Sequence, residues 1–197
     1  MTTKARGRLA VTAVAVSVLL VAAIATAVAG YTLSYTVEGR SMAPTLEPGH
    51  RVLTAPFSGD YSPVRLDIVV AHPTPGSAPV VKRIVGMPGD QVRMADGRAR
   101  VRPGGAGPWL ALAVPGTGDA WHSTPRTCCT AEGTGGVDAP ATVPPGHVWL
   151  LGDNIPVSDD SRAYGFLPFS AIDAPLWLRT WPIGSAGELV GAAGLVP

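Results

Sequence analysis

The chain has 197 residues, of which 46% are hydrophobic and 15% are charged, whereas about 25% of residues are charged in an average soluble domain. So apolar a chain is not expected to be disordered, and the roughly 165 residues beyond the first 30 are enough to bury a core. Without Lys4, Arg6 and Arg8, the 15 basic residues fall to 12 against 14 acidic ones. No basic nucleic-acid-binding surface is therefore predicted.

An uncharged run of 21 residues, 9–29, is predicted to form a transmembrane helix, because at about 1.5 Å per residue it spans the roughly 30 Å core of a bilayer. Residues 1–8 carry three basic and no acidic side chains, so the positive-inside rule predicts a cytoplasmic tail and an extracytoplasmic domain beyond residue 30. A cleaved signal peptide is the alternative, since residues 25–27 and 27–29 fit the A-x-A cleavage pattern. The length favours a retained anchor, because cleavable apolar cores have about 7–15 residues.

The exported part is predicted to be an all-β domain built on an antiparallel sheet. Residues 31–38 alternate apolar and polar side chains, which indicates a strand with one buried face. Short apolar runs bounded by Gly and Pro predict further strands at 51–54, 67–71, 79–85 and 147–151. Residues 91–95 and 98–102 flank Asp96-Gly97, a pair typical of a two-residue hairpin turn. No segment beyond residue 30 shows a helical period over three turns.

Composition divides the exported part into a β domain, 31–102 and 147–182, and a small loop-rich inserted lobe, 103–146, that is richer in Gly, Pro and Thr. A C-terminal tail, 183–197, is apolar, but it contains Glu188 and is broken by Gly and Pro. It is therefore not predicted to be a second membrane helix.

Two adjacent cysteines, Cys128 and Cys129, lie in the inserted lobe. A disulfide between neighbours closes a strained ring, so a pair of loop thiols and an intermolecular bridge remain open as well. A zinc site with His122 is not predicted, because both the number of ligands and their spacing are wrong.

Ser41, in the segment GRSMAPTL at residues 39–46, is the first candidate for chemistry. A serine between a strand and a Pro turn is commonly only a turn residue. The segment differs from the G-x-S-x-G nucleophile elbow, because Ala43 holds the last Gly position and Pro44 does not lead into a helix. An α/β-hydrolase is therefore excluded.

Lys82 is the only lysine beyond the N-terminal tail. In a strand it shares a face with Val80 and Ile84, and if that face is buried, burial lowers the lysine pKa and provides a neutral amine as a general base. The alternative is a solvent-facing lysine with Val81 and Val85 turned inward. A third polar segment, LGDNIPVSDDSRAYG, could equally be a surface turn.

Together these segments, behind an N-terminal anchor, resemble the bacterial type I signal peptidases, the membrane-anchored Ser/Lys proteases that release exported proteins. The resemblance runs through SM-x-PTL at 41–46, DIVV at 67–70, KR-I-V-G-x-PGD at 82–90, and GDN…S-x-DSR-x-x-G at 152–165. It implies a β-sheet catalytic domain lying against the outer membrane face, with no metal or cofactor. Such enzymes cleave signal peptides of exported pre-proteins after A-x-A-like small residues, and bind them as an added strand.

The resemblance also implies roles for single residues. Ser41 attacks the scissile carbonyl, and neutral Lys82 takes its proton and returns it to the leaving amine. Ser158 matches the serine that orients the lysine amine, and Asp160 and Arg162 match a supporting ion pair.

The same resemblance implies roles for residues at three further positions. Asp153 is expected to brace the loop that carries Ser158, and Met42 to line the floor of the substrate pocket. Gly39 stands where many relatives carry a serine that helps bind the oxyanion, so the oxyanion hole would use backbone N–H groups, that of Ser41 and one from the Gly39 turn.

Two competing functions remain. A Ser-His hydrolase would need one of the four histidines, none of which lies in the four segments: His50, His72, His122 and His147. The other is a catalytically impaired, membrane-anchored β domain that binds exported peptides or envelope partners. This alternative remains because Gly39 stands where many relatives have a serine, and because Ile155, Pro156 and Val157 replace the polar residues that usually follow GDN. Trp177 and Trp181 are interpreted as packed or rim residues, with a membrane-interface contact as the alternative.

Overall fold

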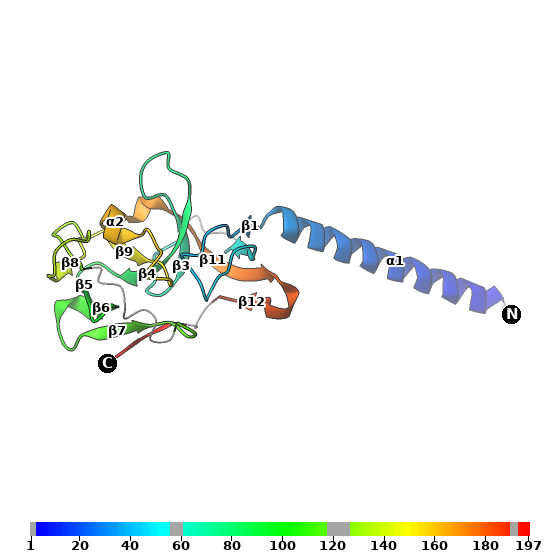
Figure 1. Cartoon of the computed structure of the whole chain (residues 1–197). Coiled ribbons are helices and arrows are strands. Elements are labelled where there is room, and N and C mark those ends of the chain that lie inside the picture. The colour runs from blue at the N-terminus through cyan, green and yellow to red at the C-terminus, as the bar shows by residue number, and fades with distance from the viewer. Residues whose placement is uncertain (1–2, 56–60, 118–126, 190–192) are drawn as a thin grey trace.

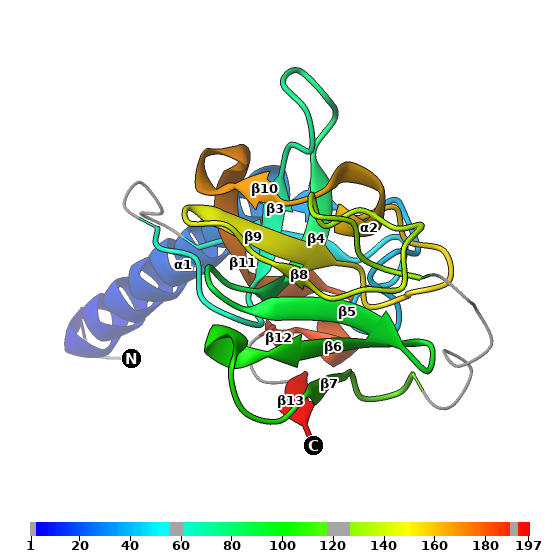
Figure 2. The same cartoon turned by 90° about the vertical axis from the view of Figure 1, so that its left-hand side faces the viewer.

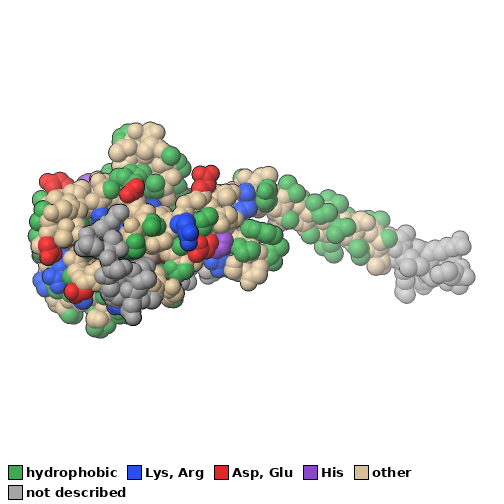
Figure 3. Space-filling model, viewed as in Figure 1, with side chains coloured by type: hydrophobic (Ala, Val, Ile, Leu, Met, Phe, Trp, Pro, Cys, Tyr) green, Lys and Arg blue, Asp and Glu red, His purple; other side chains and the backbone are tan. Residues whose placement is uncertain are grey.

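The computed structural model describes residues 3–55, 61–117, 127–189 and 193–197. One long helix, α1 (Thr3–Thr32), projects from a folded β domain, with the N-terminus at its far end (Figure 1). The segment Val11–Thr32 is long and apolar enough to cross a bilayer, with a mean hydropathy of 2.5, and none of it is buried in the protein. Its apolar side chains cover the helix on the face seen in Figure 3.

The domain contains two antiparallel sheets, which confirms the predicted all-β class with one preceding helix. The larger sheet has the order β1-β2-β11-β3-β4-β9-β10, with β12 paired to β11, and the smaller has the order β13-β7-β6-β5-β8. The strands of the larger sheet are β1 (Tyr35–Thr36), β2 (Arg51–Thr54), β3 (Ile68–Ala71), β4 (Val80–Gly86), β9 (His147–Leu151), β10 (Leu167–Pro168), β11 (Ile172–Trp181) and β12 (Gly187–Glu188). Those of the smaller sheet are β5 (Gln91–Ala95), β6 (Arg98–Arg102), β7 (Leu110–Ala113), β8 (Ala141–Thr142) and β13 (Gly194–Val196). One short α-helix, α2 (Ser161–Tyr164), follows β9, and the described residues also contain three short 3₁₀ helices at Pro103–Gly105, Phe169–Ala171 and Ile183–Ser185. The smaller sheet lies at the end of the molecule away from α1, in front in Figure 2.

The predicted strand over residues 31–38 is wrong for most of its length. The helix continues through Thr32, because the N–H of Leu33 still donates to the carbonyl of Ala29 at 3.0 Å. Only Tyr35 and Thr36 pair as a strand, and the side chain of Leu33 is 71% exposed rather than buried. Apolar side chains at every second position therefore did not mark a buried face here.

The other predicted strands form within one residue of their expected bounds. The hairpin of β5 and β6 turns at Asp96 and Gly97, whose φ angles are 53° and 70°. A two-residue hairpin turn needs positive φ at both positions, which is why Asp-Gly is favoured there.

Three groups of buried side chains form the core and cover both faces of the larger sheet. One surrounds Trp149 between the two sheets, and another contains Ile84 and Leu150. The third lies under the turn that follows β1 and includes Met42 and Leu46. The strands β4 and β9 are consequently buried on both faces, which explains their nearly continuous apolar sequences.

Candidate active site

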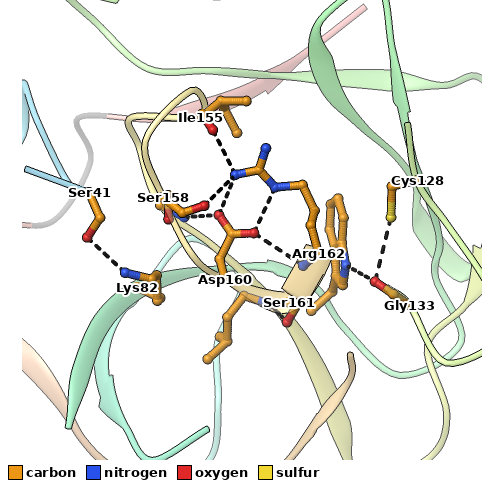
Figure 4. A network of polar contacts seen from close by, with 12 residues as sticks. Ser41, Lys82, Cys128, Gly133, Ile155, Ser158, Asp160, Ser161 and Arg162 are labelled. Carbon is orange, nitrogen blue, oxygen red and sulfur yellow. Dashed lines mark hydrogen bonds and ion pairs between the residues drawn. The ribbon is translucent and has the colours of Figure 1, made fainter. Parts of the chain in front are cut away.

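Ser41 and Lys82 meet at the centre of the site, although 41 residues separate them in the chain. Ser41 lies in the turn after β1, and Lys82 lies in β4 between β3 and β9. The Nζ of Lys82 donates to the Oγ of Ser41 at 2.8 Å (Figure 4). A lysine amine and a serine hydroxyl at this distance are placed for direct proton transfer.

Lys82 is buried, with only 4% of its surface exposed. Burial lowers the pKa of Lys82 from its usual value, and Asp160 and Asp159, through their negative charges, oppose that shift in part. Every residue of β4 from Lys82 to Gly86 is buried, so core side chains cover both faces of this strand and the lysine faces the protein interior. The solvent-facing alternative for this lysine is therefore excluded.

Two backbone carbonyls next to the Ser41 side chain are held by Asn154, which the sequence analysis did not select. The backbone N–H of Asn154 donates to the carbonyl of Ser41 at 2.9 Å, and its side-chain amide donates to the carbonyl of Arg40 at 3.1 Å. In a trans peptide the C=O and N–H point in opposite directions. Holding the Arg40 carbonyl therefore also fixes the direction of the Ser41 N–H. The available signal was that Asn154 is the only asparagine of the chain.

Ser158 lies beside the backbone of Ser41, with Gly152 between them. A Cβ placed on Gly152 would overlap both the Oγ of Ser158 and the carbonyl oxygen of Ser41. The side chain of Ser158 is fully buried. Glycine at 152 is thus required for the two segments to approach each other, and the orienting role of Ser158 stays a prediction.

Asp160 and Arg162 lie together behind the Ser158 loop. Their ion pair has an Nη2–Oδ2 distance of 2.7 Å and is almost fully buried. Asp160 also accepts the N–H of Gly152, and Arg162 donates to the carbonyls of Ile155 and Ser158 (Figure 4). The pair therefore connects both ends of the loop. Backbone groups satisfy Asp160 and the Nη2 of Arg162, as a buried ion pair requires, whereas the buried Nη1 of Arg162 has no hydrogen-bond partner among the described residues.

Asp153 pairs with Arg83, a second residue that the sequence analysis did not select. The guanidinium of Arg83 donates to both carboxylate oxygens of Asp153, at 2.8 and 2.6 Å, and both side chains are buried. Thr45 donates its hydroxyl hydrogen to the same carboxylate. Asp153 thus joins the Ser41 turn to β4, and the signal for Arg83 was its position next to Lys82 in the third segment.

An open cleft of about 490 Å³ leads to Ser41 and Lys82. Residues 36–39 line one wall, residues 78–82 line the other, and Met42 completes the lining. Gly39, the expected oxyanion-turn residue, lies on the wall next to Ser41, and space is open around its Cα.

The described histidines make their contacts away from this pair. His50 accepts the N–H of Glu47, His72 pairs with Asp173 at 2.9 Å, and His147 contacts the carbonyl of Pro145. His122 lies outside the described residues. Within the described part of the chain, no group of three or more His, Cys, Asp or Glu side chains is placed to hold a metal ion.

Cys128 and Cys129 form a disulfide with each other, which resolves the alternatives that the sequence left open. Both are buried in the core around Trp149. The carbonyl of Gly133 accepts the indole N–H of Trp149 and lies 3.6 Å from the Sγ of Cys128 (Figure 4). The disulfide therefore packs into the core behind the Asp160 loop rather than at the surface.

Comparison with known proteins identifies the family of the chain. The chain matches the family described as signal peptidase, peptidase S26, over residues 8–181. It is 34% identical to a signal peptidase I of Bacillus caldolyticus, over 76% of this chain and 79% of that protein. It is 32% identical to a signal peptidase I of Streptococcus pneumoniae serotype 4, over 77% and 83% of the two chains.

Two further similarities extend this set. The mitochondrial inner membrane protease subunit 1 of Xenopus tropicalis is 31% identical, over 77% of this chain and 70% of that protein. A solved signal peptidase I from Enterococcus faecalis V583 aligns with a TM-score of 0.44 and 27% identity, over 58% of this chain and 97% of that one. The family match covers most of the chain and includes the Ser41 turn and β4. The chain therefore belongs to the signal peptidase family, peptidase S26, and is a hydrolase of the signal peptidase I type.

Proposed function

We propose that this hydrolase is a membrane-anchored serine endopeptidase that removes signal peptides from exported pre-proteins with a Ser41–Lys82 dyad. The observation that carries the proposal is the 2.8 Å contact between a serine hydroxyl and a buried lysine amine at the end of an open cleft. Because burial lowers the pKa of Lys82, a larger fraction of the amine is neutral than in a solvated lysine. A neutral amine has the lone pair that a general base needs.

The reaction begins when the Oγ of Ser41 attacks the scissile carbonyl and Lys82 accepts the hydroxyl proton. The tetrahedral intermediate carries its negative charge on the former carbonyl oxygen, where the N–H of Ser41 and one from the Gly39 turn donate to it. Lys82 then gives the proton to the leaving amine, and an acyl-enzyme on Ser41 remains. Water, deprotonated by Lys82, hydrolyses the ester and restores the serine.

The surrounding loop keeps the two reacting groups in place. Ser158 orients the amine of Lys82, and the Asp160–Arg162 pair holds the loop that carries Ser158. Asp153 braces the Ser41 turn against β4 through its contacts with Thr45 and Arg83. These residues are positioning residues, since the serine and the lysine alone exchange protons with the substrate.

The substrate binds as an extended strand between the two walls of the cleft. Backbone groups of residues 36–39 and 78–82 supply hydrogen bonds along its length, as in other cases of strand addition. Met42, which is 1% exposed, and the neighbouring Val37 form a shallow apolar floor. Such a floor admits alanine-sized side chains at the first and third positions before the cleaved bond.

The helix α1 anchors the enzyme in the cell membrane. The basic tail at residues 1–8 keeps the N-terminus in the cytoplasm, so the catalytic domain (31–102 and 147–182, with its inserted lobe at 103–146) is extracytoplasmic. Eight residues separate Thr32, the last helical residue, from Ser41. The partners are thus membrane lipid and the signal peptides of pre-proteins, with no role for nucleic acid, metal or cofactor.

Cleavage of a membrane-presented A-x-A precursor by the full chain in vesicles tests this function. Ser41→Ala and Lys82→Ala are each expected to abolish cleavage. The domain is expected to stay folded, because the contact that is lost is a hydrogen bond between the two side chains and not a structural ion pair. A variant without any of the four histidines is the matched control and is expected to remain active. Activity in Ser41→Ala, or its loss in the histidine-free control, contradicts the proposal.

A further inference from the structure

The junction between α1 and the sheet is held by one arginine from another strand. Only residues 33 and 34 separate the end of α1 from β1. Arg51 lies in β2 directly opposite Thr36 of β1 and, on its other side, opposite Trp181 of β11. The hydroxyl of Thr180 donates to the carbonyl of Arg51 at 3.2 Å. The arginine is therefore fixed at its backbone by the larger sheet.

The guanidinium of Arg51 makes four hydrogen bonds to the junction. Its Nη2 donates to the carbonyls of Tyr31, at 2.6 Å, and Ser34, at 3.1 Å. Its Nε donates to the hydroxyl of Ser34 at 2.7 Å, and its Nη1 to that of Thr36 at 3.0 Å. The same group stacks on the ring of Tyr31, 3.9 Å from the ring centre. Four of these five contacts join the sheet to Tyr31, in the last turn of α1, or to Ser34, which follows it; the fifth, to Thr36, lies within the sheet.

The need for such a group follows from the physics of a helix end. The last four carbonyls of a helix have no partner within the helix, and the end carries a partial negative charge. The last turn of α1 contains no basic residue of its own. Arg51 donates to one carbonyl of this turn, that of Tyr31, which also accepts the hydroxyl of Ser34, and it supplies the positive charge. Its planar fork reaches several acceptors at once, which the single ammonium of a lysine does not.

We propose that Arg51 is a positioning residue that sets the angle and height of the catalytic domain over the bilayer, and so selects which bond of a membrane-bound precursor reaches Ser41. The inference rests on the proposed function, since it takes α1 as the anchor and Ser41 as the nucleophile. Without Arg51, residues 33 and 34 keep only their own hydrogen bonds to the carbonyls of Ala29 and Tyr31, and they become a hinge between α1 and the sheet. Ser41 then samples a range of heights, and a precursor whose cleavage site stands at one height meets it less often.

Two substrate formats separate this role from a purely structural one. The first is a short soluble peptide with an A-x-A site, and the second is a set of precursors in which the same site follows a hydrophobic segment after spacers of increasing length. The full chain is reconstituted in vesicles as wild type, Arg51→Met, Arg51→Lys and Ser34→Ala. Arg100→Met is the matched control, because Arg100 lies in β6 of the smaller sheet, away from α1.

Wild type and Arg100→Met are expected to cleave one spacer length best. Arg51→Met should cleave the soluble peptide within about twofold of wild type, as expected of a change outside the catalytic core. Its turnover of the best precursor should fall by roughly tenfold, because displacements near 1 Å already cost up to about a hundredfold. Its dependence on spacer length should also become flatter. Ser34→Ala should change the same quantities in the same direction by less.

Several outcomes would overturn the inference. Equal losses on both substrates would show a general structural role, and unchanged precursor cleavage would show none. Full rescue by Arg51→Lys, or an effect that disappears when anionic lipids are left out of the vesicles, would mean that the charge of Arg51 acts on anionic lipid headgroups instead of on the helix end. A wild-type enzyme that cleaves neither substrate would refute the proposed function itself, and this inference with it.

Discussion

Replacing Lys82 by methionine should abolish turnover and, at the same time, stabilise the folded domain at mildly alkaline pH. The substitution conserves side-chain volume approximately and removes the titrating group. An unfolded lysine has a pKa near 10.5, and burial lowers the pKa of Lys82 in the folded protein. Between these two values the unfolded chain binds a proton that the folded chain does not. The stability of the wild type therefore rises with pH across this interval, whereas that of the variant has no such dependence.

The size of the effect follows from the linkage between protonation and folding. Each pH unit inside the interval changes the free energy of unfolding by about 1.4 kcal/mol. Inside the interval the wild type therefore loses about 1.4 kcal/mol of stability for each unit that the pH falls below the unfolded pKa of the lysine. The lost hydrogen bond to Ser41 offsets about 1 kcal/mol of the variant's gain. We expect Lys82→Met to become more stable than wild type about one pH unit below the unfolded pKa, and its advantage to grow by about 1.4 kcal/mol for each further unit down to the lowered pKa of folded Lys82.

Urea unfolding of the full chain in detergent, followed by tryptophan fluorescence between pH 7 and 10, measures this difference. Lys4→Met removes the only other lysine, which lies in the N-terminal tail, and should leave the pH dependence unchanged. A Lys82→Met protein that is less stable at pH 8, or a stability difference that does not change with pH, would refute a lysine held neutral by burial.

Two further substitutions test the electrostatics and the packing of the site. The exposed carboxylate of Asp159 raises the pKa of Lys82, so Asp159→Asn should move the acid limb of the pH–kcat/KM profile to lower pH by a few tenths of a unit; an unchanged or alkaline-shifted limb would contradict this. Gly152→Ala should reduce kcat by about a hundredfold or more, because its methyl group overlaps the Oγ of Ser158 and the carbonyl of Ser41. Steady-state kinetics checks the second prediction, and near-normal kcat in a folded Gly152→Ala enzyme would contradict the proposed packing.

Much of the fold could be predicted because the deciding patterns are local. The β5–β6 hairpin needs only two alternating strands and an Asp-Gly turn, and the structure has both. The segment at residues 31–38 was misassigned because alternating apolar residues also fit the exposed end of a long helix. Whether Leu33 is covered depends on where α1 ends, and that end contacts Arg51, which lies 18 residues beyond Leu33 in the chain.

Site residues could be predicted only where the residue type and its sequence segment indicate the chemistry. Ser41 and Lys82 stand in segments that resemble a known family, and the structure places them in contact. Arg83 and Asn154 were missed because their partners lie 70 and 114 residues away along the chain. Their hydrogen bonds exist only once the sheet brings β4, the Ser41 turn and the loop after β9 together.

The central claim is that a neutral amine at position 82 accepts the proton of Ser41, and Lys82→Arg tests it most directly. Arginine keeps a long basic side chain, but its guanidinium stays protonated and cannot act as a base. The measurement is turnover of a membrane-presented A-x-A precursor by wild-type and Lys82→Arg enzymes across the pH range in which both remain folded. The account predicts no cleavage by Lys82→Arg at any pH. Sustained turnover by that variant would contradict it.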